Sequence, residues 1–329
     1  MTRPFLRHMK YLRLTTNDPY YNLAVEEYLF RYSDEDIFML WQNRPSVIIG
    51  KNQNAFAEVN TESAAEKGIS IVRRITGGGA VYHDMGNVNY TFITSCEKAG
   101  ALNFAYFTRP VIEALGALGL TATLNGRNDI LCGERKVSGN AQFSDGKRVL
   151  HHGTLLFDAD LGELASILKV DKEKMRSKAV KSHSGRVANM ASLLAESLSV
   201  EEFICHLEHH VCDALAASRL ALPEDARLDE LCARNRSEAW IFSEKRYLRE
   251  YTLSKRKRFD FGTVSLELLL NGDVIERAVV TGDFFEVRPV REWEERLEGL
   301  TVAQMQAQDP SPYIHRMTAA DLKDLLENG

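Results

Sequence analysis

The chain has 329 residues, of which 44% are hydrophobic and 26% charged, with a formal net charge of -5. This is ordinary globular composition, long enough for two domains, and the charge gives no global reason to expect nucleic-acid binding. The longest apolar runs fall far short of the ~20 residues of a membrane span, and the start shows no secretory signal. We therefore expect a cytoplasmic protein that does not cross a membrane.

Helix and strand patterns alternate in the N-terminal part of the chain. Asp18 can cap a helix and Pro19 fits its first turn, and apolar residues then recur at helical spacing as far as Tyr32. The apolar runs 37–41 and 46–50 predict two strands. Because turn residues lie between them, we expect these two strands to pair.

The middle of the chain continues the alternation. Residues 60–68 predict a short capped helix, residues 69–72 a strand, and residues 104–118 a helix that Gly119 ends. Ser199-Val200-Glu201-Glu202 is a capping box before an amphipathic pattern, which predicts a further helix.

The chain changes character between residues 244 and 258, where the basic run Lys255 to Arg258 predicts a solvated linker and a domain boundary. Beyond it, the strands predicted at 263–270 and 274–281 flank Asn271-Gly272-Asp273, a strong hairpin signal. A capping box at Thr301 and a helical pattern at 318–326 complete a small α+β unit.

The densest chemical signal is the stretch from Arg73 to Asp84, which contains the triplet Gly77-Gly78-Gly79. A bare glycine triplet is most often a flexible turn, but each glycine costs backbone entropy on folding. Glycines also allow backbone N–H groups to approach an anion, and Arg73 and Arg74 add positive charge. The stretch therefore indicates a carboxylate or phosphate ligand, although it is neither a lysine-containing phosphate loop nor a dinucleotide fingerprint.

The whole motif, Arg-Arg-x-Thr-Gly-Gly-Gly-Ala-Val-Tyr-His-Asp-x-Gly-Asn at 73–87, resembles the signature of lipoate-protein ligases, which share a fold with biotin-protein ligases and octanoyltransferases. Segments 126–130, 135–141 and 151–156 match the family's later motifs in order and spacing. The likeness covers most of residues 10 to 195, with a weaker match at 261–283.

The resemblance implies an α+β protein with a biotin/lipoate-ligase-like catalytic domain, whose mixed β-sheets are flanked by helices, and a small α+β C-terminal domain. We expect a catalytic lipoate- and ATP-binding domain at 1–244, a linker at 245–258 and an accessory domain at 259–329.

The implied activity uses ATP and Mg²⁺ to convert free lipoate to lipoyl-AMP, with release of pyrophosphate. The lipoyl group then passes to a specific lysine of an apo lipoyl domain of a 2-oxoacid dehydrogenase E2 subunit or of the glycine-cleavage H protein. We expect a monomer with no nucleic-acid or membrane partner. The sequence does not distinguish lipoate from octanoate or one acceptor from another.

By the same resemblance, Lys136 contacts both the acyl carbonyl and the α-phosphate, and a fixed cation there would stabilise charge developing in both half-reactions. Asp129 is the best magnesium ligand, with Asp84 as an alternative, because magnesium prefers a carboxylate together with phosphate oxygens and waters. We assign no proton transfer to the nearby histidines. The other implied substrate- and ATP-binding residues are Arg74, Thr76, Gly77, Gly78, Gly79, Ala80, Val81, Tyr82, Gly139, Ala141, Gly153 and Thr154.

The segment from Ser182 to Val187 departs from the family pattern, because it lacks one arginine and a β-branched residue. In the family this loop is associated with closing over the adenylate, so the departure concerns the efficiency of activation or the identity of the acceptor.

Two other functions stay open. A transferase of the same superfamily would hold the acyl group as a thioester without ATP, and Cys132, four residues before Lys136, invites that reading. The sequence around Cys132 does not match the transferase motif, however, and a nucleophilic thiol needs a lowered pKa. The other alternative is a sensor that only binds a lipoyl domain or a nucleotide. The presence of Lys136 argues against it. The five cysteines show no metal-type spacing, and we expect free thiols.

Overall fold

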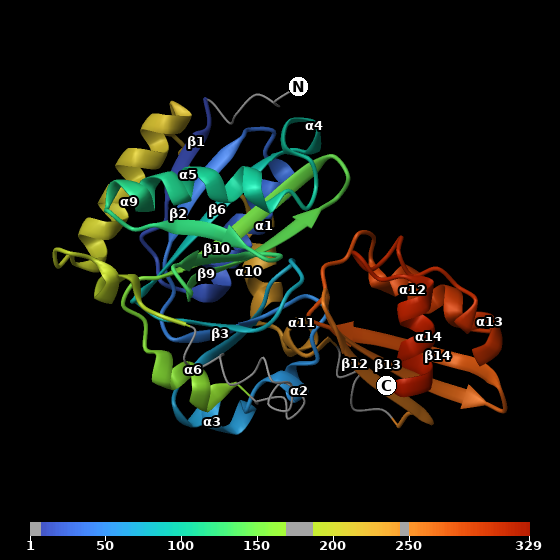
Figure 1. Cartoon of the computed structure of the whole chain (residues 1–329). Helices are drawn as coiled ribbons and strands as arrows, with labels where there is room; N and C mark the ends of the chain where they lie inside the picture. Colours follow the sequence, from blue (N-terminus) through green and yellow to red (C-terminus); the bar gives the residue numbers. More distant parts are fainter. Residues whose placement is uncertain (1–7, 169–186, 244–249) are drawn as a thin grey trace. The chain divides into compact units, whose positions relative to one another are not determined.

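The computed structural model describes residues 8–168, 187–243 and 250–329 (Figure 1). The chain divides into two compact units. The first consists of Met1–Ile48, Val59–Val72 and Val81–Ser237, and the second of Ile49–Glu58, Arg73–Ala80 and Glu238–Gly329.

The first unit is built on an eight-stranded mixed sheet with the order β11-β1-β2-β6-β10-β9-β8-β7. β1 runs parallel to β2 and β11, whereas the pairs from β2 through β6, β10, β9 and β8 to β7 are antiparallel. The strands are β1 (Lys10–Arg13), β2 (Ile37–Trp41), β6 (Asn87–Ser95), β7 (Ala122–Asn125), β8 (Asp129–Cys132), β9 (Arg135–Ser144), β10 (Arg148–Leu156) and β11 (Ser218–Arg219).

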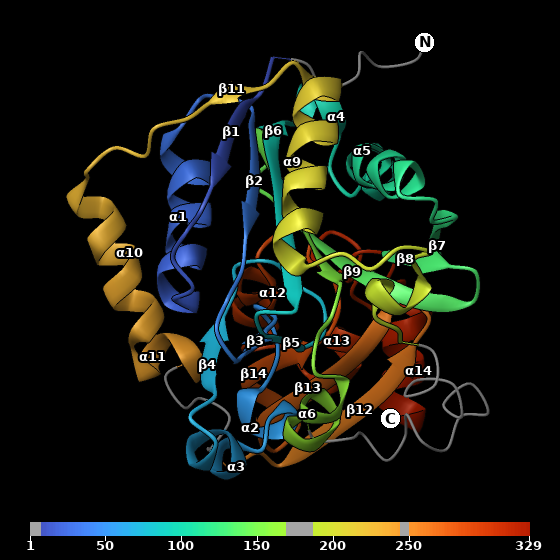
Figure 2. The same ribbon diagram turned by 90° about the vertical axis from the view of Figure 1, so that its left-hand side faces the viewer.

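Helices cover both faces of this sheet (Figure 2). α5 (Phe104–Ala117) and α9 (Val200–Leu215) lie on one face, and α1 (Pro19–Tyr32) lies on the other. Phe107 and Phe203 belong to the same buried cluster as Phe38 and Phe92 of the sheet, so the core lies between the sheet and the α5/α9 pair. The other helical segments among the described residues of this unit are α3 (Thr61–Glu66), α4 (Cys96–Ala99), α6 (Leu161–Ile167), the 3₁₀ helix η2 (Met190–Leu193) and α10 (Ala226–Arg236).

A second, three-stranded sheet has the order β4-β3-β5, with β3 (Ser46–Ile49), β4 (Ser70–Arg73) and β5 (Val81–His83). The predicted pairing of the runs 37–41 and 46–50 is therefore wrong, because β2 and β3 belong to different sheets. Asn43, between the two strands, is buried and accepts a hydrogen bond from Asn22 Nδ2 at 3.0 Å. The segment expected to form a hairpin turn instead carries the chain from one sheet to the other.

In the second unit, the C-terminal segment forms an antiparallel sheet with the order β12-β13-β14. Its strands are β12 (Leu253–Phe259), β13 (Gly262–Asn271) and β14 (Val274–Gly282), and its helices are α12 (Val290–Leu297), α13 (Val302–Gln306) and α14 (Ala319–Asn328). Phe284 and Trp293 are buried in the core of this sheet and its helices. The earlier part of the unit contains α2 (Ala55–Glu58) and α11 (Glu238–Ile241).

The basic run Lys255 to Arg258 is part of β12, so the predicted linker is wrong where it includes residues 253–258. Lys257 Nζ lies 2.7 Å from Asp324 Oδ1, and Arg256 donates to Ser265 Oγ at 3.0 Å. A helix carboxylate thus neutralises Lys257 and a cross-strand hydroxyl accepts from Arg256, where the sequence suggested solvated charges. The functional division into a catalytic and an accessory domain remains a prediction, and the compact units divide the chain differently because residues 73–80 belong to the second.

The helix caps and the hairpin turn that the sequence predicted are present in the structure. Asp18 accepts the Tyr20 N–H at the start of α1, and both capping-box hydrogen bonds are present at Ser199 and at Thr301. The predicted hairpin joins β13 to β14, with Gly272 at a φ of +64°.

All five cysteines are free, as expected. In the part of the chain that the structure describes, no helix is both long enough and apolar enough to span a membrane.

His151 on β10 is fully buried and stacks on the Phe107 ring with the centroids 4.9 Å apart. Its Nδ1 pairs with the Gln142 amide nitrogen at 2.8 Å and its Nε2 with Asn140 Oδ1 at 3.2 Å. One acceptor and one donor are what a neutral imidazole offers. Burial accordingly lowers the pKa of His151 well below its usual value.

We expect His151 to make the folded protein less stable as the pH falls. The unfolded chain binds a proton near pH ~6.5, whereas folded His151 resists protonation, so its contribution is complete above that pH and is lost below it. Urea unfolding at pH 7.5 and 5.5 should show a smaller loss for His151→Gln than for wild type. His209→Gln, at an exposed position, is the matched control. Equal losses in wild type and His151→Gln would contradict the assignment.

Candidate active site

The predicted site residues divide between the two compact units. Val81, Tyr82, Asp129, Lys136, Gly139, Ala141, Gly153 and Thr154 belong to the first unit, and Arg74, Thr76, Gly77, Gly78, Gly79 and Ala80 belong to the second.

Lys136 and Asp129 lie on neighbouring strands of the first unit. Asp129 begins β8 and pairs in register with Gly139 of β9, which also carries Lys136. Lys136 Nζ is 2.7 Å from Asp129 Oδ1, and each side chain is about one-third exposed, at 33% and 35%. The ammonium group is therefore held in place by a carboxylate while it remains accessible to a ligand.

Gly139 makes room for this lysine. A Cβ at position 139 would lie 3.3 Å from Lys136 Nζ and 3.4 Å from its Cε, tighter than most side-chain contacts. The Gly139 N–H donates to Thr154 Oγ1 at 3.2 Å, so β9 and β10 are tied together beside the lysine. The sheet thus brings Lys136, Asp129, Gly139 and Thr154 together.

Gly153 and Ala141 belong to the same strand pair but are buried by protein atoms. A Cβ on Gly153 would overlap Asn140 Oδ1 and the Tyr90 ring, which excludes any larger residue there. Ala141 is buried and pairs in register with His152. Ala141 thus lies on the Lys136 strand and Gly153 on the neighbouring strand β10, and the smallness of Gly153 has a packing reason.

Val81 and Tyr82 on β5 pair with Ile48 and Val47 of β3. Val81 is half-buried, whereas Tyr82 is 7% exposed. Burial, followed by the charge of Asp84, raises the pKa of Tyr82 to about 12, so its hydroxyl is neutral at physiological pH.

Asp84 is unsuited to its alternative role as a magnesium ligand. Its Oδ1 accepts the N–H groups of Gly86 and Asn87, and its Oδ2 accepts the N–H of Asp160 at 2.7 Å. The Asp84 carboxylate therefore holds backbone N–H groups of neighbouring segments in place.

His152 pairs with the buried carboxylate of Glu26, with its Nδ1 2.9 Å from Oε1. The sequence did not indicate this contact.

The glycine-rich loop of the second unit is built around Arg74, which is 5% exposed. Its Nε donates to Thr76 Oγ1 at 2.9 Å, and its Nη2 donates to the carbonyls of Gly77 and Gly79, each at 2.8 Å. The guanidinium thus fixes the shape of the loop from inside.

The glycine triplet has a packing requirement that the sequence did not reveal. A Cβ on Gly77 would overlap the carbonyl oxygen of Phe284, and Gly78 has a φ of +91°. The Gly78 N–H donates to the Phe284 carbonyl at 3.3 Å rather than to an anion. The idea of a flexible turn is therefore wrong, because close backbone packing requires glycine at 77 and the positive φ favours glycine at 78.

Arg73 was expected to add positive charge beside an anion, and this is wrong. Its side chain is 2% exposed and donates to backbone carbonyls of residues 50–53 and 240–241. A buried guanidinium with such partners offers no donor to a ligand in this conformation.

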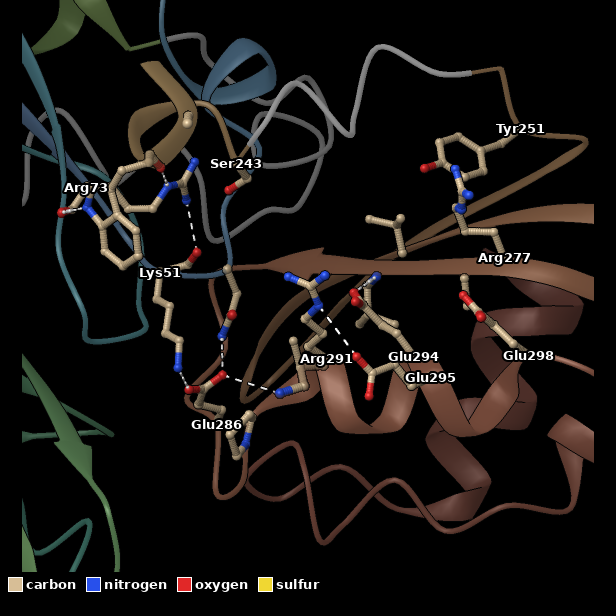
Figure 3. A pocket seen from close by; sticks show the side chains of 18 residues that line it. Lys51, Arg73, Ser243, Tyr251, Arg277, Glu286, Arg291, Glu294, Glu295 and Glu298 are labelled. Atoms are coloured by element: carbon tan, nitrogen blue, oxygen red, sulfur yellow. Dashed lines mark hydrogen bonds and ion pairs between the residues drawn. The ribbon is translucent and has the colours of Figure 1, made fainter. Parts of the chain in front are cut away.

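The second unit contains a cavity of about 640 Å³. Figure 3 shows the side chains that line it, which include Arg73 but none of the other residues predicted to bind ligand. Opposite charges meet on its wall, where Lys51 pairs with Glu286 and Arg291 Nε lies 3.6 Å from Glu295. This arrangement does not produce a strongly charged ligand site.

The segment 182–187, which departs from the family pattern, lies outside the described residues except for Val187. Val187 forms a parallel bridge with Lys136, and the Ala188 N–H donates to the Lys136 carbonyl at 3.0 Å. The residues that follow this segment are therefore hydrogen-bonded to the backbone of Lys136.

Cys132 pairs with Arg135 at the end of the β8–β9 hairpin and is half-buried. Burial raises the pKa of its thiol, opposite to what an acyl-accepting thiolate needs. We expect Cys132→Ser to retain most of the ligase activity, measured as modified acceptor by mass spectrometry. Loss of the reaction in a folded Cys132→Ser protein would restore the thioester mechanism.

The mixed sheet of the first unit carries the hairpin with Lys136 and Asp129, and the glycine-rich loop belongs to the second unit. Residues 18–212 match the family model of the lipoyl protein ligase A/B catalytic domain, and residues 249–326 match the bacterial lipoate protein ligase C-terminus. The chain belongs to the lipoate-protein ligase family.

Relatives and solved structures agree with this assignment. The chain is 38% identical over 322 residues to the lipoate-protein ligase LplJ of Bacillus subtilis, covering 94% of this chain and 97% of the relative. The bipartite lipoate protein ligase of Thermoplasma acidophilum, solved in a study with its E2 lipoyl domain, is 29% identical with a TM-score of 0.62, covering 76% of this chain and 100% of that one. A lipoate-protein ligase A bound with ATP is 28% identical with a TM-score of 0.58, covering 71% and 98%. The predicted enzyme class and fold are thereby confirmed.

Proposed function

We propose that this lipoate-protein ligase is a monomer that uses ATP to convert free lipoate to lipoyl-AMP and then lipoylates a lysine of an acceptor protein. The observation that carries the proposal is the accessible ammonium group of Lys136, held 2.7 Å from Asp129 beside Gly139. The ATP bound to a similar ligase and the E2 lipoyl domain studied with another support the nucleotide and the acceptor class. The apo H protein is the other acceptor that we propose.

In the first half-reaction, a carboxylate oxygen of lipoate attacks the α-phosphorus of ATP. The bond from that phosphorus to the oxygen bridging to the β-phosphate breaks, and pyrophosphate leaves. Negative charge on the α-phosphate oxygens develops where Lys136 offers a fixed cation. Since Asp129 already holds the ammonium group, little reorganisation is needed at that moment.

In the second half-reaction, the neutral amine of the acceptor lysine attacks the acyl carbonyl of lipoyl-AMP. An amide bond forms, the bond to the AMP oxygen breaks, and the amine loses its proton to solvent. Lys136 can stabilise the oxyanion on the carbonyl in this step as well. One lysine therefore serves both half-reactions.

The remaining site residues have binding roles in this proposal. The apolar surface of Val81 and Tyr82 would contact the dithiolane tail, and Arg74 would keep Thr76 and the Gly77–Ala80 loop in shape for the adenylate. Gly139, Ala141, Gly153 and Thr154 would support the strands beside Lys136. The hydrogen bonds from Arg74 to the loop support its shaping role, and the bond from Gly139 to Thr154 supports the role of the strands.

Asp129 also fits a magnesium ion. Magnesium is commonly held by one or two carboxylates together with substrate phosphates and waters, and Asp129 is an accessible single carboxylate beside the lysine that would meet the α-phosphate. Bound with the nucleotide, the ion would neutralise phosphate charge. In the part of the chain that is described, there is no group of three or more His, Cys, Asp or Glu side chains that could hold a metal without such phosphates.

We further propose that residues 259–329 have an accessory role in forming the adenylate. Phe284 contributes the carbonyl that accepts from the Gly78 N–H, and the Glu286 side chain, 5% exposed, accepts from Lys51 and Asn52. The C-terminal segment thereby supports the glycine-rich loop in the second unit. This gives it an effect on activation without a nucleotide contact of its own.

The experiment is to incubate the purified full-length protein with lipoate, Mg²⁺ and an apo lipoyl domain or apo H protein, with and without ATP. We expect lipoylated acceptor and pyrophosphate only where ATP is present, and lipoyl-AMP when the acceptor is omitted. Acyl transfer from an octanoylated donor protein without ATP would instead show a transferase. Binding of lipoate and ATP without any product would show a sensor.

A further inference from the structure

The contacts of Arg73 point to a residue that acts on the glycine-rich loop without touching a ligand. We propose that Arg73 is a positioning residue that joins this loop to α11, so that the ligand affinity of the loop depends on α11. The inference deepens the proposed function and rests on it, since the affected step is the formation of the adenylate.

The guanidinium of Arg73 connects two segments that are distant in the sequence from each other (Figure 3). Nη1 donates to the carbonyls of Gly50, Lys51 and Gln53 at 2.8–2.9 Å. Nε donates to the carbonyls of Trp240 and Ile241, each at 3.0 Å, and Nη2 donates to Ile241 at 2.6 Å. The Trp240 indole N–H returns a hydrogen bond to the Arg73 carbonyl at 3.0 Å.

These acceptors suit a guanidinium and no other side chain. The planar fork presents five N–H groups in fixed directions, whereas a lysine ammonium offers three from a single point. The last carbonyls of a helix have no partner within it and carry partial negative charge. Arg73, at 2% exposure, supplies donors and a positive charge at the C-terminal end of α11.

The segment that Arg73 holds is also the wall against which the glycine-rich loop packs. A Cβ on Gly50 would overlap the Gly78 carbonyl oxygen, so the two backbones are in close contact. The Lys51 N–H donates to the Thr76 carbonyl at 2.8 Å, and the Arg74 N–H donates to the Ile49 carbonyl at 3.0 Å. A shift of residues 50–53 would therefore move the loop that Arg74 shapes.

A purely structural role for Arg73 would lower the folded fraction and leave the folded enzyme unchanged. A positioning role predicts a specific defect in the folded enzyme. Formation of lipoyl-AMP should suffer, whereas the KM for the acceptor in transfer from supplied lipoyl-AMP should not. A displacement of about 1 Å in a positioned group can cost on the order of 10²-fold in rate.

The test compares full-length Arg73→Lys, Arg73→Ala and Trp240→Phe with Arg109→Lys, a change at an exposed α5 position, as control. We expect lipoyl-AMP formation, corrected for folded protein by circular dichroism, to fall by ~10²-fold in Arg73→Lys and less in Trp240→Phe. The lipoate affinity of both variants should fall in calorimetry. Added methylguanidinium should partly restore Arg73→Ala, and the acceptor KM should stay at the wild-type value.

Wild-type adenylation and lipoate affinity in folded Arg73→Lys would overturn the proposal. If the Arg73 variants do not fold, Trp240→Phe decides, and unchanged affinity there overturns it. If wild-type protein forms no lipoyl-AMP, the proposed function fails, and calorimetry still tests Arg73 separately through lipoate affinity.

Discussion

Replacing Lys136 with alanine is expected to lower lipoyl-AMP formation and lipoyl transfer together, each by ~10²–10³-fold, because a preorganised cation at developing charge typically contributes that much. The side chain is one-third exposed, so its removal leaves no buried cavity, and the thermal midpoint should change little. The two half-reactions are measured separately, as pyrophosphate release without acceptor and as transfer from supplied lipoyl-AMP.

Two variants make this experiment specific. Lys147→Ala removes an exposed lysine from the β9–β10 hairpin and should have wild-type rates. Asp129→Asn keeps the shape of the partner but removes its charge, so it should weaken the anchoring of Lys136 and reduce both steps less than Lys136→Ala does. Near-normal rates for Lys136→Ala in either half-reaction would exclude the dual role.

The features that the sequence predicted correctly are those with a local cause. A cap at Asp18 or Ser199 depends on residues two or three positions away, and the β13–β14 hairpin depends on the turn at Gly272. Asp129 and Lys136 meet in a similarly local way, since they are seven positions apart on the two strands of one hairpin. In each case the chain meets itself within a few residues, so spacing alone contains the information.

The features that escaped prediction depend on contacts between distant residues. Arg73 is buried because the carbonyls of Gly50 and Ile241 meet it, and no period in the sequence brings those three positions together. The prediction that β2 pairs with β3 was wrong for a similar reason. β2 pairs with β1 and β6 instead, and the arrangement of the whole sheet determines these partners. An arginine beside glycines could be read as an anion contact, but its actual acceptors are backbone carbonyls.

The second large effect is expected at Gly77, where alanine should impair lipoate and ATP binding and also destabilise the protein. The new Cβ would overlap the Phe284 carbonyl oxygen, and neither backbone can yield without moving the loop that Arg74 holds. Such overpacking typically costs about 1–3 kcal/mol, and a loop displaced by about 1 Å can lose ~10² in rate. Calorimetry with each ligand and urea unfolding measure the two effects.

Gly116→Ala is the matched control, because it adds the same methyl group inside α5, where no atom outside the helix's own backbone lies within 4 Å of the new Cβ. That change should leave ligand binding untouched and stabilise the protein by roughly 0.5–1 kcal/mol through helix propensity. If Gly77→Ala destabilises the protein and Gly116→Ala stabilises it, Gly77 is required for close packing at the loop. Wild-type affinities in Gly77→Ala would mean that the backbone relaxes without disturbing the ligand-binding loop, and the link between packing and binding would then be wrong.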